Sequence, residues 1–184
     1  MDRCRIRNTQ SADKRSSRRR FLAGLGAILA ARTALATNVS PEKTAVEMVT
    51  PEAAKAIERG LALLASRQQD DGSFGSGGYS RNVAVAALAG MAFMYGGSTP
   101  ERGRYGRNVE RAADFILAHM QESGFITVPG AASHGPMYGH GFATLFLAEC
   151  YGMSPRRDLK ESVAKAVNLI VNTQNNQGGW RYQP

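Results

Sequence analysis

From residue 51 onward, the apolar and polar positions form two alternating kinds of segment. Three segments, at about 51–68, 107–121 and 159–174, place apolar residues three and four apart, which predicts helices with one apolar and one polar face. Two others, Val83 to Tyr95 and Gly141 to Tyr151, are apolar on every side, which predicts buried helices. The pattern therefore predicts an all-α fold of helical hairpins, with buried helices inside and amphipathic helices outside.

The amphipathic segments recur with a period of 53 residues. Four columns keep this spacing: Gly60, Ala113 and Ala166; Leu63, Ile116 and Leu169; Leu64, Leu117 and Ile170; and Gln68, Gln121 and Gln174. Offsets of 0, 3, 4 and 8 within each copy lie on one helix face, and a glycine-containing loop follows each copy. This internal repeat predicts hairpins that stack side by side.

Local signals mark the starts of two of these helices. Thr50 is a candidate N-cap, Pro51 suits the first helical position and Glu52 places an acid in the first turn. Asp158 and Glu161 have the spacing of a capping box ahead of the last amphipathic segment. Both sites are therefore expected to begin helices.

The N-terminal 36 residues have a different composition. A basic stretch precedes an apolar run at 21–31 and the sequence Ala34-Leu35-Ala36, which is the layout of a cleaved signal peptide. Ser17-Arg18-Arg19-Arg20-Phe21-Leu22 resembles the twin-arginine export motif. Eleven apolar residues cover about half of a bilayer's hydrocarbon thickness, so no permanent membrane span is expected.

These features divide the chain into three parts. We expect a twin-arginine signal peptide over 1–36, a linker over 37–50 and the helical repeat domain over 51–184. The twin-arginine export machinery is the partner that this leader implies, and the expected location is periplasmic or otherwise extracytoplasmic. Only Cys150 remains once Cys4 is removed with the leader, so the exported chain forms no internal disulfide.

The net charge of +8 belongs mainly to the leader. Residues 1–36 carry +7, and the remaining residues carry about +1 from fourteen basic and thirteen acidic side chains. A nearly neutral body offers no extended positive field to a phosphate backbone. The composition therefore disfavours nucleic-acid binding.

Each copy of the repeat ends in an amide side chain, a short loop, a glycine and an aromatic residue. The residues are Gln68, Gly72 and Phe74 in the first copy, Gln121, Gly124 and Phe125 in the second, and Gln174, Gly179 and Trp180 in the third. The pattern resembles the QW motif of the squalene cyclase and prenyltransferase family, over residues 51–184. In that family the motif ties hairpins together and is structural.

The resemblance implies an α/α toroid of about six hairpins. The chain holds two hairpins and one extra outer helix, and it stops within the third motif. Repeat arrays need capping units, because an uncapped end exposes the apolar face that the next helix covers. We therefore expect the sequence to be a fragment, or the product of a truncated gene.

Candidate chemistry is concentrated in the glycine-rich segment 133–141, which is predicted to be a loop leading into a buried helix. His134, Tyr138 and His140 in this segment are candidates for proton transfer or for binding a polar ligand. Glu149 is the only charged residue of the helix that follows. The alternative is a tight turn whose histidines cap the helix or bond to backbone groups. No metal-ligand spacing and no cofactor motif accompanies these residues.

Three functions remain open. The first is a terpenoid-cyclase-like enzyme acting on a polyprenyl substrate; the second is a non-catalytic binding or scaffold toroid; the third is an α/α-toroid polysaccharide lyase acting on a carbohydrate. The Asp-x-Asp-Asp acid motif of squalene cyclases is absent from the chain, and Asp70-Asp71 is interpreted as a solvated turn. Export disfavours the first function, because squalene cyclases work at the cytoplasmic membrane face. The residues leave open whether the chain is an enzyme.

We predict that the exported protein begins at Thr37, because signal peptidase cleaves after an A-x-A sequence such as Ala34-Leu35-Ala36. Intact-mass measurement of the exported protein checks this. A mass that still includes residues 1–36 contradicts it.

Overall fold

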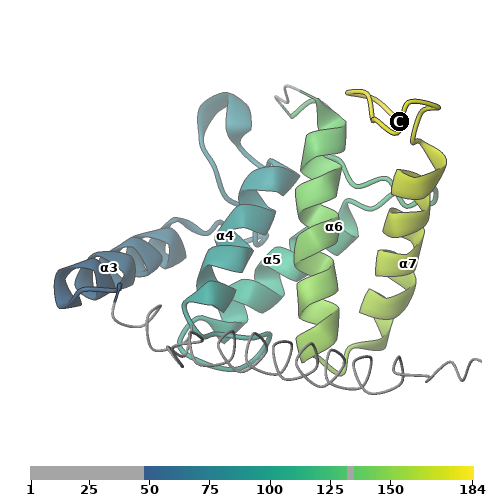
Figure 1. Ribbon diagram of the computed structural model, residues 1–184. Coiled ribbons are helices and arrows are strands. Elements are labelled where there is room, and N and C mark those ends of the chain that lie inside the picture. Colours follow the sequence, from purple (N-terminus) through teal and green to yellow (C-terminus); the bar gives the residue numbers. More distant parts are fainter. Residues whose placement is uncertain (1–47, 132–134) are drawn as a thin grey trace, which may run out of the picture. The chain divides into compact units, whose positions relative to one another are not determined.

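The computed structural model describes residues 48–131 and 135–184, so the predicted signal peptide, most of the linker and His134 lie outside the described residues. Within the described residues the fold is all-α, as predicted (Figure 1). The elements are α3 (Pro51–Arg67), a 3-10 helix (Gly77–Tyr79), α4 (Val83–Tyr95), α5 (Gly106–Ala118), α6 (Pro136–Met153) and α7 (Arg157–Asn172). No strand forms among these residues, and the only β pairing is two isolated bridges.

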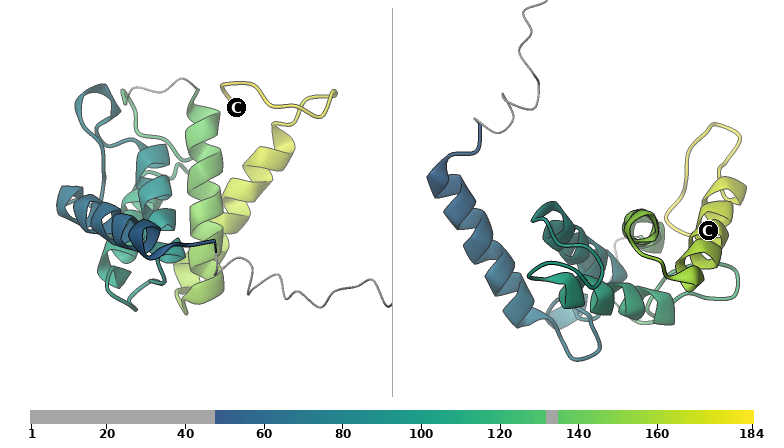
Figure 2. Two further views of the ribbon diagram at one scale, coloured as in Figure 1. Left: turned by 60° about the vertical axis from the view of Figure 1, so that its left-hand side comes forward. Right: turned by 90° about the horizontal axis from the view of Figure 1, so that it is seen from below.

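The two predominantly apolar helices, α4 and α6, lie side by side and run in the same direction (Figures 1 and 2). The amphipathic helix α5 returns between them on one side, and α7 packs against α6 in the same way. In Figure 1, none of the described helices crosses in front of α4 and α6. We call α4 and α6 the inner helices and α3, α5 and α7 the outer helices. Helix α3 packs least, and Leu61 is its one buried residue.

Glycines allow the two inner helices to approach closely. A Cβ atom on Gly90 of α4 would lie 2.5 Å from the ring of Phe146 on α6. A Cβ atom on Gly139 would lie 3.1 Å from Val83. The buried ring of Phe146 therefore fills the space that the missing side chain of Gly90 leaves.

The same five-residue turn follows each outer helix. The first N–H donates to the fifth carbonyl at 2.8–2.9 Å, and the fourth N–H donates to the first carbonyl at 2.9–3.0 Å. The three turns are Gln69–Ser73, Gln121–Phe125 and Asn175–Gly179. Their fourth residues, Gly72, Gly124 and Gly178, have φ values of +86°, +88° and +80°, which only glycine adopts readily.

These turns correct the alignment of the middle repeat by one residue. Gln68 and Gln174 donate from Nε2 to the glycine carbonyl of their own turns, at 3.1 and 2.9 Å. The equivalent residue of the middle copy is Met120, while Gln121 begins the turn itself. The turns are therefore 52 residues apart (69 to 121) and then 54 apart (121 to 175) instead of 53.

The corrected alignment changes the aromatic position as well. The residue after each turn is Phe74, Ile126 and Trp180, so Ile126 takes the place that the sequence assigned to Phe125. Phe74 and Ile126 are buried in the core, whereas Trp180 is 47% exposed. The Trp180 indole N–H donates to the carbonyl of Ile170 at 2.7 Å.

Two local predictions about helix starts are wrong. Helix α6 begins at Pro136, so the second half of the predicted loop 133–141 is helical. Proline is well suited to the first helical position, so Pro136 was a signal for a helix start. The neighbouring glycines led to the segment being interpreted as a loop. The capping box of Asp158 does not form either, because α7 already begins at Arg157 and Asp158 pairs with Arg156 instead.

The inner helices are buried on one side only. Helix α4 spans Val83–Tyr95 as predicted, and most of its residues are buried. Leu88 is nevertheless 47% exposed and Tyr95 is 77% exposed, so the helix is not covered all round. Of the described helices, none combines the length and apolar character needed to cross a bilayer.

Replacing Gly90 with alanine is expected to destabilise the fold by about 1–3 kcal/mol, because the new methyl group overlaps the Phe146 ring. Gly141→Ala in α6 is the matched control, since no atom lies within 4 Å of the added Cβ. That control is expected to be neutral or to stabilise the helix by up to about 1 kcal/mol. Urea denaturation of the two variants measures the difference, and equal midpoints contradict the packing described for Gly90.

Candidate functional site

His140 is fully buried and both of its ring nitrogens are engaged. The backbone N–H of Ile126 donates to Nδ1 at 3.2 Å. Because Nδ1 accepts, Nε2 carries the proton, and it donates to the carbonyl of Ala166 at 3.2 Å. The imidazole thereby joins α6 to α7 and to the segment that follows the middle turn. These bonds to backbone groups agree with the alternative interpretation of the sequence, in which the histidine has a structural role.

Burial lowers the pKa of His140, and the hydrogen bond to the Ala166 carbonyl opposes this only in part. The neutral ring therefore persists below the usual titration range of histidine. With no free nitrogen, His140 offers no acid or base to a ligand in this arrangement.

Tyr138 and Glu149 lie on a different face of α6 from His140. Their separation of eleven residues brings them back to nearly the same side of the helix, about 16 Å apart along its axis. Tyr138 is exposed, and Glu149 is half-buried without a hydrogen bond or ion pair among the described residues. The structure therefore does not bring the candidate residues His140, Tyr138 and Glu149 together at one centre.

Between Tyr138 and Glu149, α6 presents apolar side chains to the outside. Phe142 is 41% exposed and Leu145 is 48% exposed. Leu88 of α4 is exposed as well, and Val85 is half-buried. We call this surface the inner face; it consists of Val85, Leu88, Tyr138, Phe142, Leu145 and Glu149. It lies on the side of α4 and α6 that α5 and α7 leave uncovered (Figure 1).

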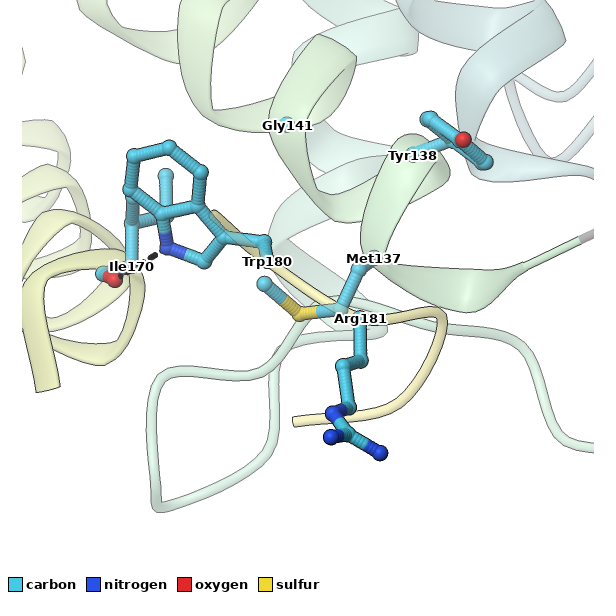
Figure 3. A pocket seen from close by; sticks show the side chains of 6 residues that line it. All are labelled: Met137, Tyr138, Gly141, Ile170, Trp180 and Arg181. Carbon is cyan, nitrogen blue, oxygen red and sulfur yellow. Dashed lines mark hydrogen bonds between the residues drawn. The ribbon is translucent and has the colours of Figure 1, made fainter. Parts of the chain in front are cut away.

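Two cavities adjoin Tyr138. The larger, of about 280 Å³, lies between α6, the end of α7 and the segment after it, and is lined by Met137, Tyr138, Gly141, Ile170, Trp180 and Arg181. Figure 3 shows the Trp180 indole close to the Met137 side chain, with its N–H bonded to Ile170. The smaller cavity, of about 150 Å³, lies between α4 and α6 and includes Val85 and Phe142.

The segment after α7 folds back over the start of α6. Tyr182 accepts a hydrogen bond from the N–H of Met137 at 3.1 Å, and its ring centroid is 5.8 Å from that of Tyr138. Arg181 provides the one charge in the lining of the larger cavity. The cavity is thus a mostly apolar space with aromatic rings at its edge, at the low end of the volumes typical of ligand sites.

The other groups singled out from the sequence have structural surroundings. Partial burial acts to raise the pKa of Asp71, but hydrogen bonds with Ser73 and the charge of Arg81 outweigh it and hold the pKa below its usual value. Burial raises the pKa of the Cys150 thiol to about 12, and its sulfur lies 3.9 Å from that of Met94. No group of three or more metal-ligating side chains gathers within the described part of the chain.

The inner face is the feature that sequence reasoning missed. Helices with apolar residues on every side were expected to be fully buried. The same pattern also fits a helix that packs against the core with one face and lines an apolar cavity with another. The available signal was the spacing of Tyr138, Phe142, Leu145 and Glu149, at intervals of four, three and four residues, which places them on one stripe of α6.

Comparison with known proteins adds no assignment. No protein-family model matches the chain, and no curated protein matches it.

His140 is expected to make stability depend on pH. Its pKa is lowered in the folded chain from an ordinary value of 6.5, so the unfolded chain takes up the proton first as the pH falls. The stability that the neutral imidazole contributes is therefore present above about pH 6.5 and declines below it. Urea unfolding at pH 8 and pH 5 measures this for the native chain and for His140→Gln, in which the decline is expected to be smaller. An identical decline in both contradicts the assigned role.

Proposed function

We propose that residues 51–184 form part of an α/α toroid of the squalene cyclase and prenyltransferase type. We further propose that the inner face binds an elongated apolar ligand such as a polyprenyl chain. The layering of the helices supports the toroid, since two parallel inner helices lie beside the outer helices α5 and α7, which run the other way. The repeated turn supports it too, because each copy uses the same backbone hydrogen bonds.

The surface of α7 supports a further hairpin packing beside it. In the corrected alignment, Val167 and Val171 correspond to Ala113 and Leu117 of α5. Ala113 is buried in the core and Leu117 is half-buried against it, whereas Val167 and Val171 are exposed. Trp180 is likewise exposed where its equivalent Ile126 is fully buried. An additional inner helix at this position would cover all three.

The observation that carries the ligand proposal is the inner face itself. An exposed row of apolar side chains beside a mostly apolar cavity loses its contact with water when a hydrocarbon chain occupies it, at about 25 cal/mol per Å² buried. Binding is proposed in preference to catalysis, because His140 is bonded through both nitrogens and lies on another face from Tyr138 and Glu149.

We also propose that the protein acts outside the cytoplasm after twin-arginine export. The support for this part is the leader sequence, with its arginines ahead of Phe21-Leu22 and its Ala34-Leu35-Ala36 end. An exported chain with an apolar face would meet lipid-derived ligands at the membrane or in the periplasm.

A carbohydrate is the second candidate ligand, in keeping with a polysaccharide lyase or a glycan-binding toroid. The observation that favours it is the group of aromatic rings around the larger cavity, formed by Tyr138, Trp180 and Tyr182, with Arg181 beside them. Amphipathic aromatic side chains combine an apolar ring face with a polar edge, which suits sugars as well as hydrocarbons.

Trp180 allows a direct test, because it is the chain's only tryptophan and lines the larger cavity. Farnesol is expected to change the tryptophan emission of the chain in a saturable way. Phe142→Ala and Tyr138→Ala are expected to weaken binding roughly tenfold each, because each removes an aromatic ring worth about 1.5 kcal/mol when buried.

Tyr95→Ala is the matched control, since Tyr95 is exposed but lies at the opposite end of α4 from the cavities. It is expected to leave farnesol binding unchanged. Saturable emission changes with an oligosaccharide such as cellohexaose but not with farnesol would favour the carbohydrate ligand. Farnesol binding that Phe142→Ala and Tyr138→Ala leave intact would remove the inner face from consideration.

A further inference from the structure

The basic side chains of the described helical unit are concentrated at one of its ends. The C-terminal ends of α4 and α6 lie together at the bottom of Figure 1, with the loops that lead into α5 and α7. The contact between Met94 and Cys150, with their sulfur atoms 3.9 Å apart, places the last turns of the two inner helices at the same level. We call this end, formed by residues 94–107 and 150–160, the basic rim.

The basic rim contains six basic and two acidic residues. At the opposite end, the segments 75–82, 119–131 and 173–184 contain two basic residues and one acidic residue. The nearly neutral total charge of residues 37–184 therefore conceals a local excess of four positive charges at the basic rim. A local cluster of cations attracts an anionic surface within about one Debye length, even when the whole body is neutral.

Most of the cations of the basic rim are available to a partner. Arg156 is occupied, since it bridges Asp114 and Asp158 at 2.6 Å each. The other five are exposed and form no ion pair among the described residues: Arg102, Arg104, Arg107, Arg157 and Lys160. Arg104 also lies over the Tyr105 ring, 5.4 Å from its centroid, and its guanidinium group stays exposed. The acids that remain near the five cations are Glu101, which is exposed, Asp70, which lines a pocket together with Arg107, and Glu149, which is half-buried one residue before the rim.

Large apolar side chains are exposed among these cations. Tyr95 at the end of α4 is 77% exposed, and Tyr151 and Met153 at the end of α6 are 44% and 49% exposed. Tyrosines favour the boundary between lipid headgroups and acyl chains, where the ring is in an apolar region and the hydroxyl group in a polar one. Clustered basic residues contribute attraction to anionic headgroups at about 1 kcal/mol each.

We propose that the basic rim docks on an anionic lipid bilayer surface, with Tyr95, Tyr151 and Met153 entering the headgroup region and the five free cations contacting lipid phosphates. The combination of unpaired cations with exposed tyrosines favours a bilayer over an acidic protein or a polyanion in solution. A soluble polyanion would use the charges and leave the apolar side chains without a role. The inner helices then stand with their C-terminal ends toward the lipid.

Sedimentation of the protein with vesicles tests this docking. Partitioning is expected into vesicles of phosphatidylglycerol mixed with phosphatidylcholine, and not into vesicles of phosphatidylcholine alone. The triple variant Arg102→Gln/Arg107→Gln/Arg157→Gln is expected to lower the partition coefficient roughly 100-fold, at about fivefold per charge. Tyr95→Ala with Met153→Ala is expected to lower it roughly tenfold with no change of charge.

The matched control is Lys55→Gln/Arg59→Gln/Arg67→Gln, which removes three exposed cations from α3 and has the same net charge as the first variant. It also accounts for the basic leader, since both triple variants retain it. The control is expected to partition nearly as well as the unaltered protein, and circular dichroism verifies that every variant is folded. Equal losses in the two triple variants would overturn the proposal in favour of a net-charge effect. No partitioning would overturn it as well, and so would tight binding to dextran sulfate with no effect of Tyr95→Ala on vesicle partitioning.

Discussion

The contact of each of the first two turns with the next outer helix is the constraint on which the repeat depends. A Cβ atom on Gly72 would overlap the backbone carbonyl of Arg111 in α5, and one on Gly124 would overlap that of Lys165 in α7. Both glycines also have a left-handed backbone conformation, so steric exclusion and local geometry select the same residue. The turn can therefore lie directly on the neighbouring helix backbone.

The two turns are fixed further by different side chains. Gln68 bonds both to its own turn and to the carbonyl of Asn108, whose amide donates back to Gln68 at 2.7 Å. The middle copy has Met120 at that position and uses His140 of the inner helix to reach Ala166 instead. Neighbouring hairpins are thus held together by different polar side chains, which form hydrogen bonds with backbone carbonyl groups. This variation explains why the middle repeat is the hardest to recognise in the sequence.

The sequence was sufficient to predict where most of the helices lie, but it was insufficient to predict which side of each helix is exposed. Helix α4 begins and ends as expected, because Asn82 caps it by accepting from the N–H groups of Ala84 and Val85 and because Gly96 and Gly97 follow it. The start of α6 was missed, since the residues from Pro136 to His140, Gly139 among them, were interpreted as part of a glycine-rich loop. Gly139 is in fact a contact residue with Val83. A single sequence does not distinguish a glycine chosen for its backbone freedom from one chosen for its small size.

The candidate site likewise depends on packing that the sequence pattern does not determine. His140 was selected for its chemistry, and its burial became visible only when Ile126 and Ala166 were placed around it. The exposure of Leu88, Phe142 and Leu145 depends on which sides of the inner helices the outer helices cover, and residue types carry little information about that. The periodic spacing of apolar residues identifies a helix. The arrangement of the neighbouring helices decides whether a given side of it is buried in the core or exposed.

The burial of Cys150 has a practical consequence for studying this protein. In the proposed exported form, which begins at Thr37 and so lacks Cys4, Cys150 is the one thiol, and it is enclosed against Met94 with a pKa of about 12. Reaction with maleimides or with hydrogen peroxide requires an accessible thiolate, which this group provides neither at neutral pH nor from its enclosed position. A second cysteine engineered on the surface would therefore take up a fluorophore or spin label selectively. Site-specific spectroscopy could then proceed with the native core left unaltered.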